Sequence, residues 1–505
     1  MTEQMIGTPC FRGRVRRPQV LVIGGGLAGM TAALAARRTG ARVTLVAEGA
    51  GVLELASGCI DRLAVPSDVL PPEHPYRLLG MEAVDRELAV FQEELSRVGW
   101  PLSPGVDVIT ALGARRPTYL VAPGMAAPPP DASVRVVGFR GLRDFDPSVV
   151  AAGLGNASWC WVDLPGSPEE IHPVALARLL EDENYRAEVI TAVRTALSQS
   201  RKAAAPLTGS VSLESGESEF PANGAGALEG SGSQFPASGA RAPQKGGSEF
   251  PTSGVRASER GGSEPTASGA SAPERGAPES PATEAGAPRG ADLQPEWVLF
   301  PAVLGLAGAS RVQQAIAEAI GMPVAEVLLP PPSVPGLRLA EFLRRAVQLA
   351  GVDLALNSRA VRAQVKDGRV VAVVCEGPGG RVRYEAEAYV LATGGLLGNG
   401  LMADGLQVTE PLFGLPVTTP QPGEPSAWAD ASFLPEGGHP FVRVGVAVND
   451  ELRPEGFANL FVCGRTLAGY DPYAEGSGGG VAVATGGVAG RRAGRLALTD
   501  GGERR

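Results

Sequence analysis

The chain is short of the residues that build metal centres and disulfide frameworks. It has 505 residues but only 5 cysteines and 3 histidines. The cysteines lie far apart and form no Cys-x-x-Cys pair: Cys10, Cys59, Cys160, Cys375 and Cys463. An odd number of scattered cysteines argues against a disulfide framework, a zinc site and an iron–sulfur cluster. We therefore expect no metal site, and a protein of the reducing cytoplasm.

An excess of positive charge and long apolar runs are also missing. The 45 Lys and Arg are outnumbered by 54 Asp and Glu, a net charge of −9, so we expect no nucleic-acid partner. No run reaches the roughly 18 to 20 apolar residues that a membrane-spanning helix needs. The arginines of residues 12–17 precede a short glycine-interrupted strand, which is unlike a signal peptide. We expect contact with the inner face of the cell membrane only through a partner.

Residues 206–292 differ sharply in composition from the rest of the chain. They are rich in Gly, Ala, Ser, Pro and Glu, and a repeat that starts at Ser218, Ser233, Ser248 and Ser263 recurs every 15 residues. Such a segment cannot bury enough apolar surface to offset its ordering entropy, so we predict a long disordered loop. A repeat expansion and a partner-binding tether are both compatible with it.

A glycine-rich turn near the start of the chain indicates a class of ligand. Residues 20–29 read Val-Leu-Val-Ile-Gly-Gly-Gly-Leu-Ala-Gly, an apolar strand that enters the spacing Gly24-x-Gly26-x-x-Gly29. Gly24 permits the tight turn, Gly26 lets a pyrophosphate approach, and Gly29 lets the next helix pack closely on the sheet. The helix start then offers free N–H groups to phosphates. The alternative is an empty Rossmann-like fold that keeps the turn for packing.

Two later segments repeat the pattern of a strand that ends in glycine. Residues 387–395 end in Thr393-Gly394-Gly395 and are similar to the return strand of flavoproteins with two dinucleotide folds. A strand that ends at Gly464 follows, and Gly478-Gly479-Gly480 then open an Ala- and Val-rich helix. This resembles the last helix of fumarate-reductase and succinate-dehydrogenase flavoproteins. Its positive end would face the flavin pyrimidine edge and stabilise negative charge on the reduced ring.

These segments supply most of the predicted cofactor-binding residues. Ser57 and Gly58 are predicted to run alongside the flavin ring, and Glu48 is predicted to lie near a ribose. The members of the predicted set are Gly24, Gly25, Gly26, Leu27, Ala28, Gly29, Glu48, Ser57, Gly58, Thr393, Gly394, Gly395, Gly464, Gly478, Gly479 and Gly480. The position expected for a ribose-binding acid is Ala47, and Glu48 lies one residue later. The turn alone favours FAD, but this departure leaves FAD and FMN both open.

A closer resemblance spans nearly the whole chain outside the insert. The blocks that carry it are residues 24–29, 57–63, 74–79, 137–145, 329–339 and 459–480. Together they resemble the family of B subunits of anaerobic glycerol-3-phosphate dehydrogenase. The resemblance implies a flavin-bearing polypeptide, assigned FMN in that family, beside a catalytic FAD-bearing A subunit and an iron–sulfur, membrane-anchoring C subunit. It also implies an oxidoreductase complex that converts sn-glycerol 3-phosphate to dihydroxyacetone phosphate and passes electrons to the quinone pool.

Few residues are suited to oxidise the substrate directly. Removing a hydroxyl proton needs a base, and holding a phosphate needs cations. His439 with Arg443 is the best catalytic pair, while Arg338 and Arg465 are further cationic candidates. This scarcity favours a polypeptide that holds a flavin and passes electrons. A stand-alone fumarate-reductase-like flavin dehydrogenase and a flavin-free assembly scaffold are the alternatives.

The predicted fold is α/β, an FAD/NAD(P)-binding Rossmann-like domain with an inserted α+β cap. We place the flavin-binding domain at residues 18–115 and 355–495, and the cap at 116–205 and 293–354. The disordered loop over 206–292 interrupts the cap.

Overall fold

The computed structural model describes a defined part of the chain. The described residues are 13–49, 51–63, 65–155, 157–203, 296–405, 407–420, 424–432, 435 and 438–503. The predicted loop over 206–292 lies outside them. Within these ranges, no helix is both long and apolar enough to cross a membrane.

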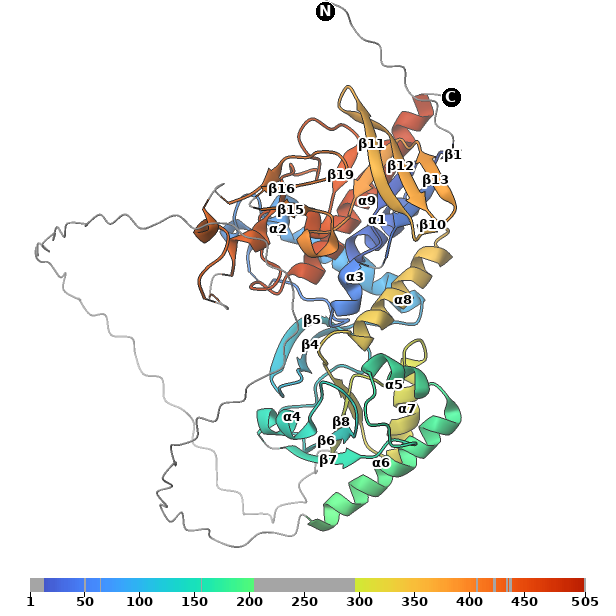
Figure 1. The fold of residues 1–505 in the computed structure, drawn as a ribbon, viewed down its shortest axis with the longest axis vertical. Coiled ribbons are helices and arrows are strands. Elements are labelled where there is room, and N and C mark those ends of the chain that lie inside the picture. Colours follow the sequence, from blue (N-terminus) through green and yellow to red (C-terminus); the bar gives the residue numbers. More distant parts are fainter. Residues whose placement is uncertain are drawn as a thin grey trace, which may run out of the picture. The chain divides into compact units, whose positions relative to one another are not determined.

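A parallel sheet of five strands forms the centre of the first core. It is built from β2 (Val20–Ile23), β3 (Val43–Ala47), β10 (Asp353–Leu356), β14 (Ala388–Leu391) and β19 (Leu460–Val462), in the order β10-β3-β2-β14-β19. All four pairings are parallel. Because β2 and β3 come from the start of the chain and the others from its second half, the fold brings distant segments together (Figure 1). The predicted Rossmann-like sheet is confirmed.

Helices α1 (Leu27–Arg38) and α9 (Gly478–Glu503) pack along each other beside this sheet (Figure 1). The contact is close because α9 has glycine where it meets α1. A Cβ at Gly486 would contact the carbonyl oxygen of Ala28, and a Cβ at Gly490 would contact that of Ala32. Helices α2 (Pro75–Leu79), α3 (Met81–Arg97) and α8 (Val334–Leu349) also belong to this part of the molecule.

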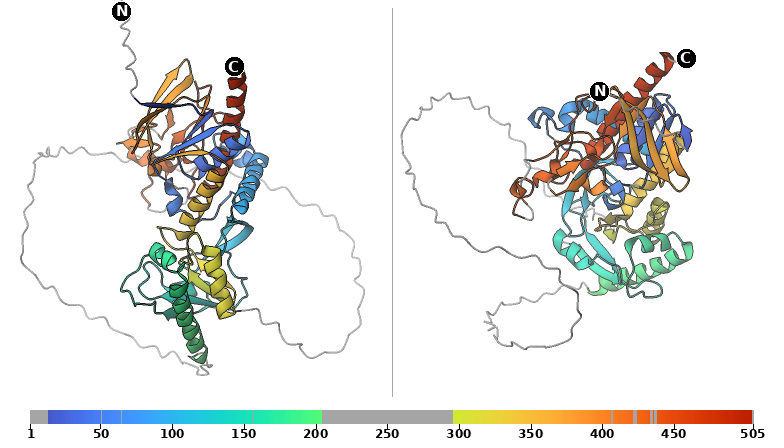
Figure 2. Two further views of the ribbon diagram at one scale, coloured as in Figure 1. Left: turned by 90° about the vertical axis from the view of Figure 1, so that its right-hand side faces the viewer. Right: turned by 45° about the horizontal axis from the view of Figure 1, so that its top comes forward.

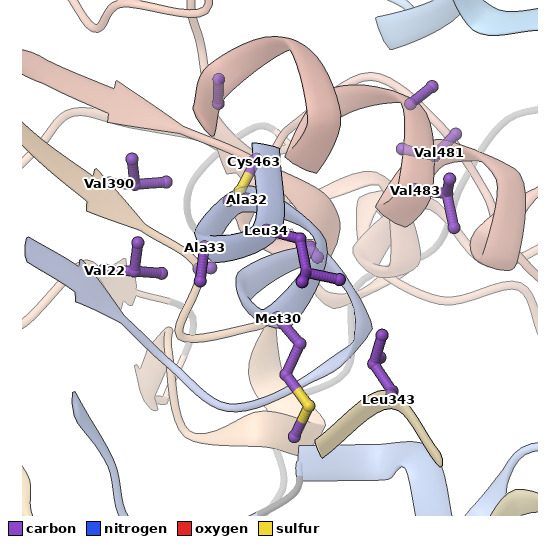
Figure 3. Close-up of a cluster of buried hydrophobic side chains, with 14 of the residues drawn as sticks. Val22, Met30, Ala32, Ala33, Leu34, Leu343, Val390, Cys463, Val481 and Val483 are labelled. Atoms are coloured by element: carbon purple, nitrogen blue, oxygen red, sulfur yellow. The ribbon is translucent and has the colours of Figure 1, made fainter. Parts of the chain in front are cut away.

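Small and branched apolar side chains fill the space between the sheet and these helices. Figure 3 shows side chains of β2, β14, α1, α8 and α9 that meet in one cluster. The labelled members are Val22, Met30, Ala32, Ala33, Leu34, Leu343, Val390, Cys463, Val481 and Val483. Burial of this apolar surface supplies the main driving force for the core.

A second sheet joins the same hydrophobic cluster. It has the order β1-β13-β12-β11 and consists of β1 (Arg14–Arg16), β11 (Arg359–Lys366), β12 (Arg369–Gly377) and β13 (Gly380–Tyr384). Strand β1 pairs in parallel with β13, and the other pairs are antiparallel. Figure 2 shows the orange strands of this sheet from two further sides. Its residues Val373, Cys375 and Tyr384 are buried in the cluster.

The inserted segment forms a separate six-stranded sheet with its own hydrophobic cluster. Its strands are β4 (Ser103–Ile109), β5 (Arg115–Val121), β6 (Val134–Phe139), β7 (Ala157–Val162), β8 (Trp297–Pro301) and β9 (Val324–Val327), in the order β5-β4-β9-β8-β6-β7. Its helices are α4 (Pro147–Leu154), α5 (Pro173–Leu179), α6 (Glu183–Ala203) and α7 (Ala309–Ile320).

The cap therefore holds strands and helices as predicted, but its sheet is more regular than an α+β arrangement. Every pairing is parallel except that of β4 with β5. Helices stand between successive strands of the run β6, β7, β8 and β9, and such crossovers produce parallel strands. The cap is thus a doubly wound unit with an antiparallel edge.

Short elements complete the described chain. They are β15 (Met402–Asp404), β16 (Gln407–Thr409), β17 (Val417–Thr418), β18 (Gly445–Val446), and the single turns η1 (Gly51–Leu55), η2 (Ser67–Val69), η3 (Leu396–Gly398), η4 (Pro425–Ala427), η5 (Pro440–Arg443) and η6 (Gly464–Thr466).

The close contact between α1 and α9 predicts a cost for one added methyl group. We expect Gly490→Ala to destabilise the protein by about 1–3 kcal/mol, because the backbone of Ala32 cannot yield as a side chain would. The matched control is Gly379→Ala, since a Cβ there meets nothing within 4 Å. Chemical denaturation of both variants measures the difference. Equal unfolding free energies would contradict the packing argument.

Candidate functional site

The glycine turn between β2 and α1 is shaped by contact on one side and space on the other. Gly24 has φ +118°, and a Cβ there would meet the carbonyl of Ala392 at the end of β14. Gly29 lies against Gly24, and a Cβ on Gly29 would lie 3.3 Å from the Ala392 Cβ. At Gly26, by contrast, a Cβ would meet nothing within 4 Å. Gly26 is the N-cap of α1, and no side chain of the described residues caps the helix. The first N–H groups of α1 therefore border this space.

The later glycine segments meet the same turn. A Cβ at Gly24 would lie 3.0 Å from the Thr393 nitrogen, and one at Gly464 would lie 2.5 Å from the Ala28 Cβ. Gly464 N–H also donates to Thr485 of α9 at 2.9 Å. The segments of Gly24, Thr393 and Gly464 therefore border one continuous region. Gly478 to Gly480, at the start of α9, lie about 12 Å further along that helix from Gly486, at 1.5 Å per residue, and contact Pro472, Ile60 and Asp61 instead.

Thr393 provides an observation that points to a ligand. Its hydroxyl oxygen is buried and has no hydrogen-bond partner among the described residues. The neighbouring Gly394 is held by Thr466, which accepts from its N–H and donates to its carbonyl, both at 3.1 Å. A buried hydroxyl without a partner is costly unless a ligand satisfies it. The turn and Thr393 therefore suit a cofactor that carries polar oxygens.

A cavity of about 770 Å³ opens beside the carboxyl ends of β2 and β3. One wall is formed by Gly25, Ala47 and Glu48, and another by Leu337 and Arg344 of α8. Glu48 follows β3 directly, and the Arg359 side chain lies 4.0 Å from its carboxylate. Cavities of roughly 300–1,000 Å³ hold small molecules and cofactor parts. Glu48 therefore lines this cavity at the end of β3, and its role as a ribose-binding acid stays a prediction.

The segment of Ser57 and Gly58 lies between α8 and the start of α9. Gly58 has φ +76°, and its position leaves no room for a side chain because Pro335 lies against it. A few residues further on, the Asp61 carbonyl accepts the Gly480 N–H at 2.8 Å. The thiol of Cys59 is buried, and this burial raises its pKa. A thiol that resists ionisation is a poor nucleophile, so Cys59 is a packing residue.

A buried polar network, which the sequence did not reveal, lies just ahead of α9. Glu475 accepts hydrogen bonds from the Asp471 N–H at 2.9 Å and the Ser477 hydroxyl at 2.8 Å. His74 Nε2 lies 3.2 Å from Glu475 Oε2. His74 Nδ1 accepts the Tyr76 N–H at 3.0 Å. Because Nδ1 is an acceptor, the proton of a neutral ring belongs on Nε2, which donates to Glu475.

Electrostatics favour the ionised form of Glu475. Partial burial alone would raise its pKa, but the hydrogen bonds from His74, the Asp471 N–H and Ser477 outweigh it, so the pKa falls below its usual 4.5. His74 itself is fully buried. It caps α2, and the rings of Tyr470 and Tyr76 lie 6.1 and 5.4 Å from its own.

The predicted catalytic pair lies on η5, near the same region. His439 begins the turn, stacks on Phe441 at 5.7 Å, and accepts the Asp430 N–H at 3.2 Å. Arg443 ends it and has an exposed side chain. Arg465 connects η5 to the glycine segments, because it donates to the Val442 carbonyl and its side chain lies against Gly395. Their catalytic roles stay predictions.

Arg338, the other cationic candidate, is held by its own partners. It is buried in α8 and binds Glu326 of β9 with two nitrogens, at 2.6 and 3.0 Å. A third nitrogen donates to the Gly305 carbonyl at 2.8 Å. Its charge is therefore neutralised inside the protein, and the arginine joins α8 to the cap's sheet instead of binding a substrate phosphate.

The parallel sheet, the glycine turn and the converging segments define a flavoprotein of the FAD-binding type. A family model described as "FAD binding domain" matches residues 19–209 and 247–481. A solved flavocytochrome c3 fumarate reductase is similar over 96% of this chain and 79% of its own, with 12% identity and a TM-score of 0.39, too low to support an argument.

Curated relatives narrow the family. A Halobacterium salinarum protein, named as a probable B subunit of anaerobic glycerol-3-phosphate dehydrogenase, is 31% identical over 94% of this chain and 97% of its own. A Vibrio cholerae protein, named as the B subunit of the same enzyme, is 26% identical over 92% and 94%. The chain belongs to this family of B subunits, which are flavin-dependent oxidoreductases, and the predicted resemblance is confirmed.

The lowered pKa of Glu475 predicts a pH-dependent contribution to stability. A carboxyl group whose pKa is lower in the folded state stabilises the fold above its unfolded pKa, and this contribution disappears as the pH falls through the folded value. We expect Glu475→Gln to be less stable than the wild type at neutral pH, with the difference narrowing below about pH 4.5. Denaturation across this range measures it. A difference in unfolding free energy that does not change with pH would show that protonation of Glu475 does not affect stability.

Proposed function

We propose that this chain is the FAD-bearing B subunit of an anaerobic, quinone-linked glycerol-3-phosphate dehydrogenase. The names of its relatives provide the substrate and the place in the complex. The single structural observation that carries the proposal is the convergence of the Gly24, Thr393 and Gly464 segments on one region that leaves Gly26 open. When bound, the flavin would accept two electrons and release them singly.

FAD is favoured over FMN by the cavity next to Gly25 and Glu48. FMN lacks the adenosine half of FAD, so it has no group to place there. The open space at Gly26 would take the pyrophosphate at the positive start of α1. Glu48 would bind the adenosine ribose, and Thr393 would donate to the cofactor from its unpartnered hydroxyl. Ser57, Gly58 and Gly478 to Gly480 would border the ring.

Substrate oxidation is assigned mainly to a partner, the FAD-bearing A subunit, with an iron–sulfur C subunit as the membrane anchor and the route to the quinone pool. Arg338 is paired inside the protein, which leaves His439 and Arg443 as the candidate base and phosphate-binding cation of this chain. We propose a cytoplasmic protein that reaches the inner face of the membrane through these partners. We keep the division of the chain into a two-part flavin-binding domain and a two-part cap, but not the boundaries at 115 and 354. Strand β4 (Ser103–Ile109) belongs to the cap's sheet, and α8 (Val334–Leu349) and β10 (Asp353–Leu356) belong to the first core.

The cofactor assignment predicts the behaviour of one glycine variant. We expect Gly26→Val to lose most of its FAD while its fold stays intact. The side chain would fill space that the phosphates need, whereas a Cβ on Gly26 meets no atom of the described residues within 4 Å. The matched control is Gly379→Val, at another glycine with open space around it. Circular dichroism and the ratio of flavin to protein absorbance measure the two effects. Acid extraction and mass analysis distinguish FAD from FMN.

The assignment of substrate oxidation to the A subunit predicts how the activity of the separated chain compares with that of the assembled complex. We expect the purified chain to be yellow and to oxidise glycerol 3-phosphate at less than about one hundredth of the rate of the complex. Most of the acid–base chemistry is assigned to the A subunit, and the loss of an acid–base group costs roughly 10²–10⁴-fold. A quinone-analogue dye assay measures it. Comparable rates would support a stand-alone dehydrogenase, in which case His439→Asn should abolish turnover. A colourless protein would support the flavin-free scaffold.

A further inference from the structure

The charged groups near the start of α9 are unequally compensated. Arg62 binds Asp85, with nitrogen–oxygen distances of 2.7 and 3.0 Å. Arg116 binds Asp61. Arg465 donates to the backbone carbonyls of Val442 and Val444. Arg62 and Arg116 are therefore paired with carboxylates, whereas Arg465 is held away from Glu475 by neutral carbonyls.

Glu475, by contrast, has no Arg or Lys partner among the described residues. Its oxygens accept from a backbone N–H, the Ser477 hydroxyl and the Nε2–H of His74. Asp471 is also bound by neutral groups, but it caps its own turn, accepting from Tyr473 and Ala474 at 3.0 Å. Only Glu475 of the two is bonded to Ser477, whose carbonyl accepts the first helical N–H, from Val481. Its negative charge therefore lies at the start of α9.

His74 fixes where this charge lies. The ring is fully buried, is held on its other nitrogen by the Tyr76 N–H, and lies edge-on to Tyr76 and Tyr470. Its Nε2–H therefore points at Glu475 with little freedom to turn. Loss of that donor would free the carboxylate to reorient toward water, because the Glu475 side chain is 21% exposed.

We propose that Glu475 is a built-in negative charge that lowers the reduction potential of the bound flavin, and that His74 is the positioning residue that holds it at the start of α9. The inference rests on the proposed FAD site. A helix start carries about half a positive charge and favours electrons on a nearby ring. A carboxylate at the same place offsets that effect. The reduced flavin then gives up electrons more readily, as a protein that passes them on requires.

The test is the midpoint potential of the flavin in the full-length, FAD-loaded chain, measured by spectroelectrochemistry. We expect Glu475→Gln to raise the potential. At the poise that half-reduces the wild type, the ratio of reduced to oxidised flavin should rise about tenfold, as for the loss of one charge at about 10 Å in partly buried surroundings. His74→Leu should shift it in the same direction but less. Glu475→Asp should keep it near the wild-type value.

The control is Glu376→Gln on β12, which removes an equal charge from an exposed pair with Arg381 of β13. We expect no shift there. An unchanged potential in FAD-loaded Glu475→Gln, or equal shifts in both Gln variants, would overturn the inference and leave the FAD assignment intact. A wild-type chain that binds no flavin at all would overturn both. If Glu475→Gln does not fold, a wild-type potential in His74→Leu would be sufficient to reject the positioning role.

Discussion

The site depends on backbones that approach more closely than side chains would allow. The Gly24 turn lies against the end of β14, and α9 lies against α1 through Gly486 and Gly490. A methyl group at any of these three positions would collide with a backbone carbonyl. The same close packing that holds the helices also brings Thr393 and Gly464 to the turn. Packing and cofactor binding are therefore two results of one constraint.

Two kinds of charged groups lie around this packed core, one paired inside the protein and one without a cationic partner among the described residues. The buried pair of Arg338 and Glu326 compensates itself and joins α8 to the cap's sheet. Glu475 is different, because no Arg or Lys of the described residues binds it and its charge lies at the start of α9. A self-compensated pair acts locally, whereas an uncompensated carboxylate acts at a distance through its field. We infer that the field of Glu475 reaches the cofactor, whereas that of the Arg338–Glu326 pair does not.

Part of the site could be predicted because its signals are local. Gly24, Gly26 and Gly29 follow directly from a strand-turn-helix pattern, and each has the surroundings that this pattern requires. The cap was harder to predict, since its parallel sheet joins strands on both sides of a long insert. The burial of Arg338 could not be predicted from the sequence. Its partner Glu326 lies on a different element, β9, and only the folded chain brings the two together. The catalytic roles of His439 and Arg443 are still predictions.

The sequence by itself determined the class of fold and the kind of ligand, because spacing within ten residues fixes a turn, a helix start and a phosphate-sized gap. Tertiary structure alone decided which distant residues share an environment. His74 and Glu475 are 401 positions apart, and no periodicity or motif connects them. They meet because the packing of α2 and the loop before α9 excludes water there, and a buried polar group must find its partner inside the protein.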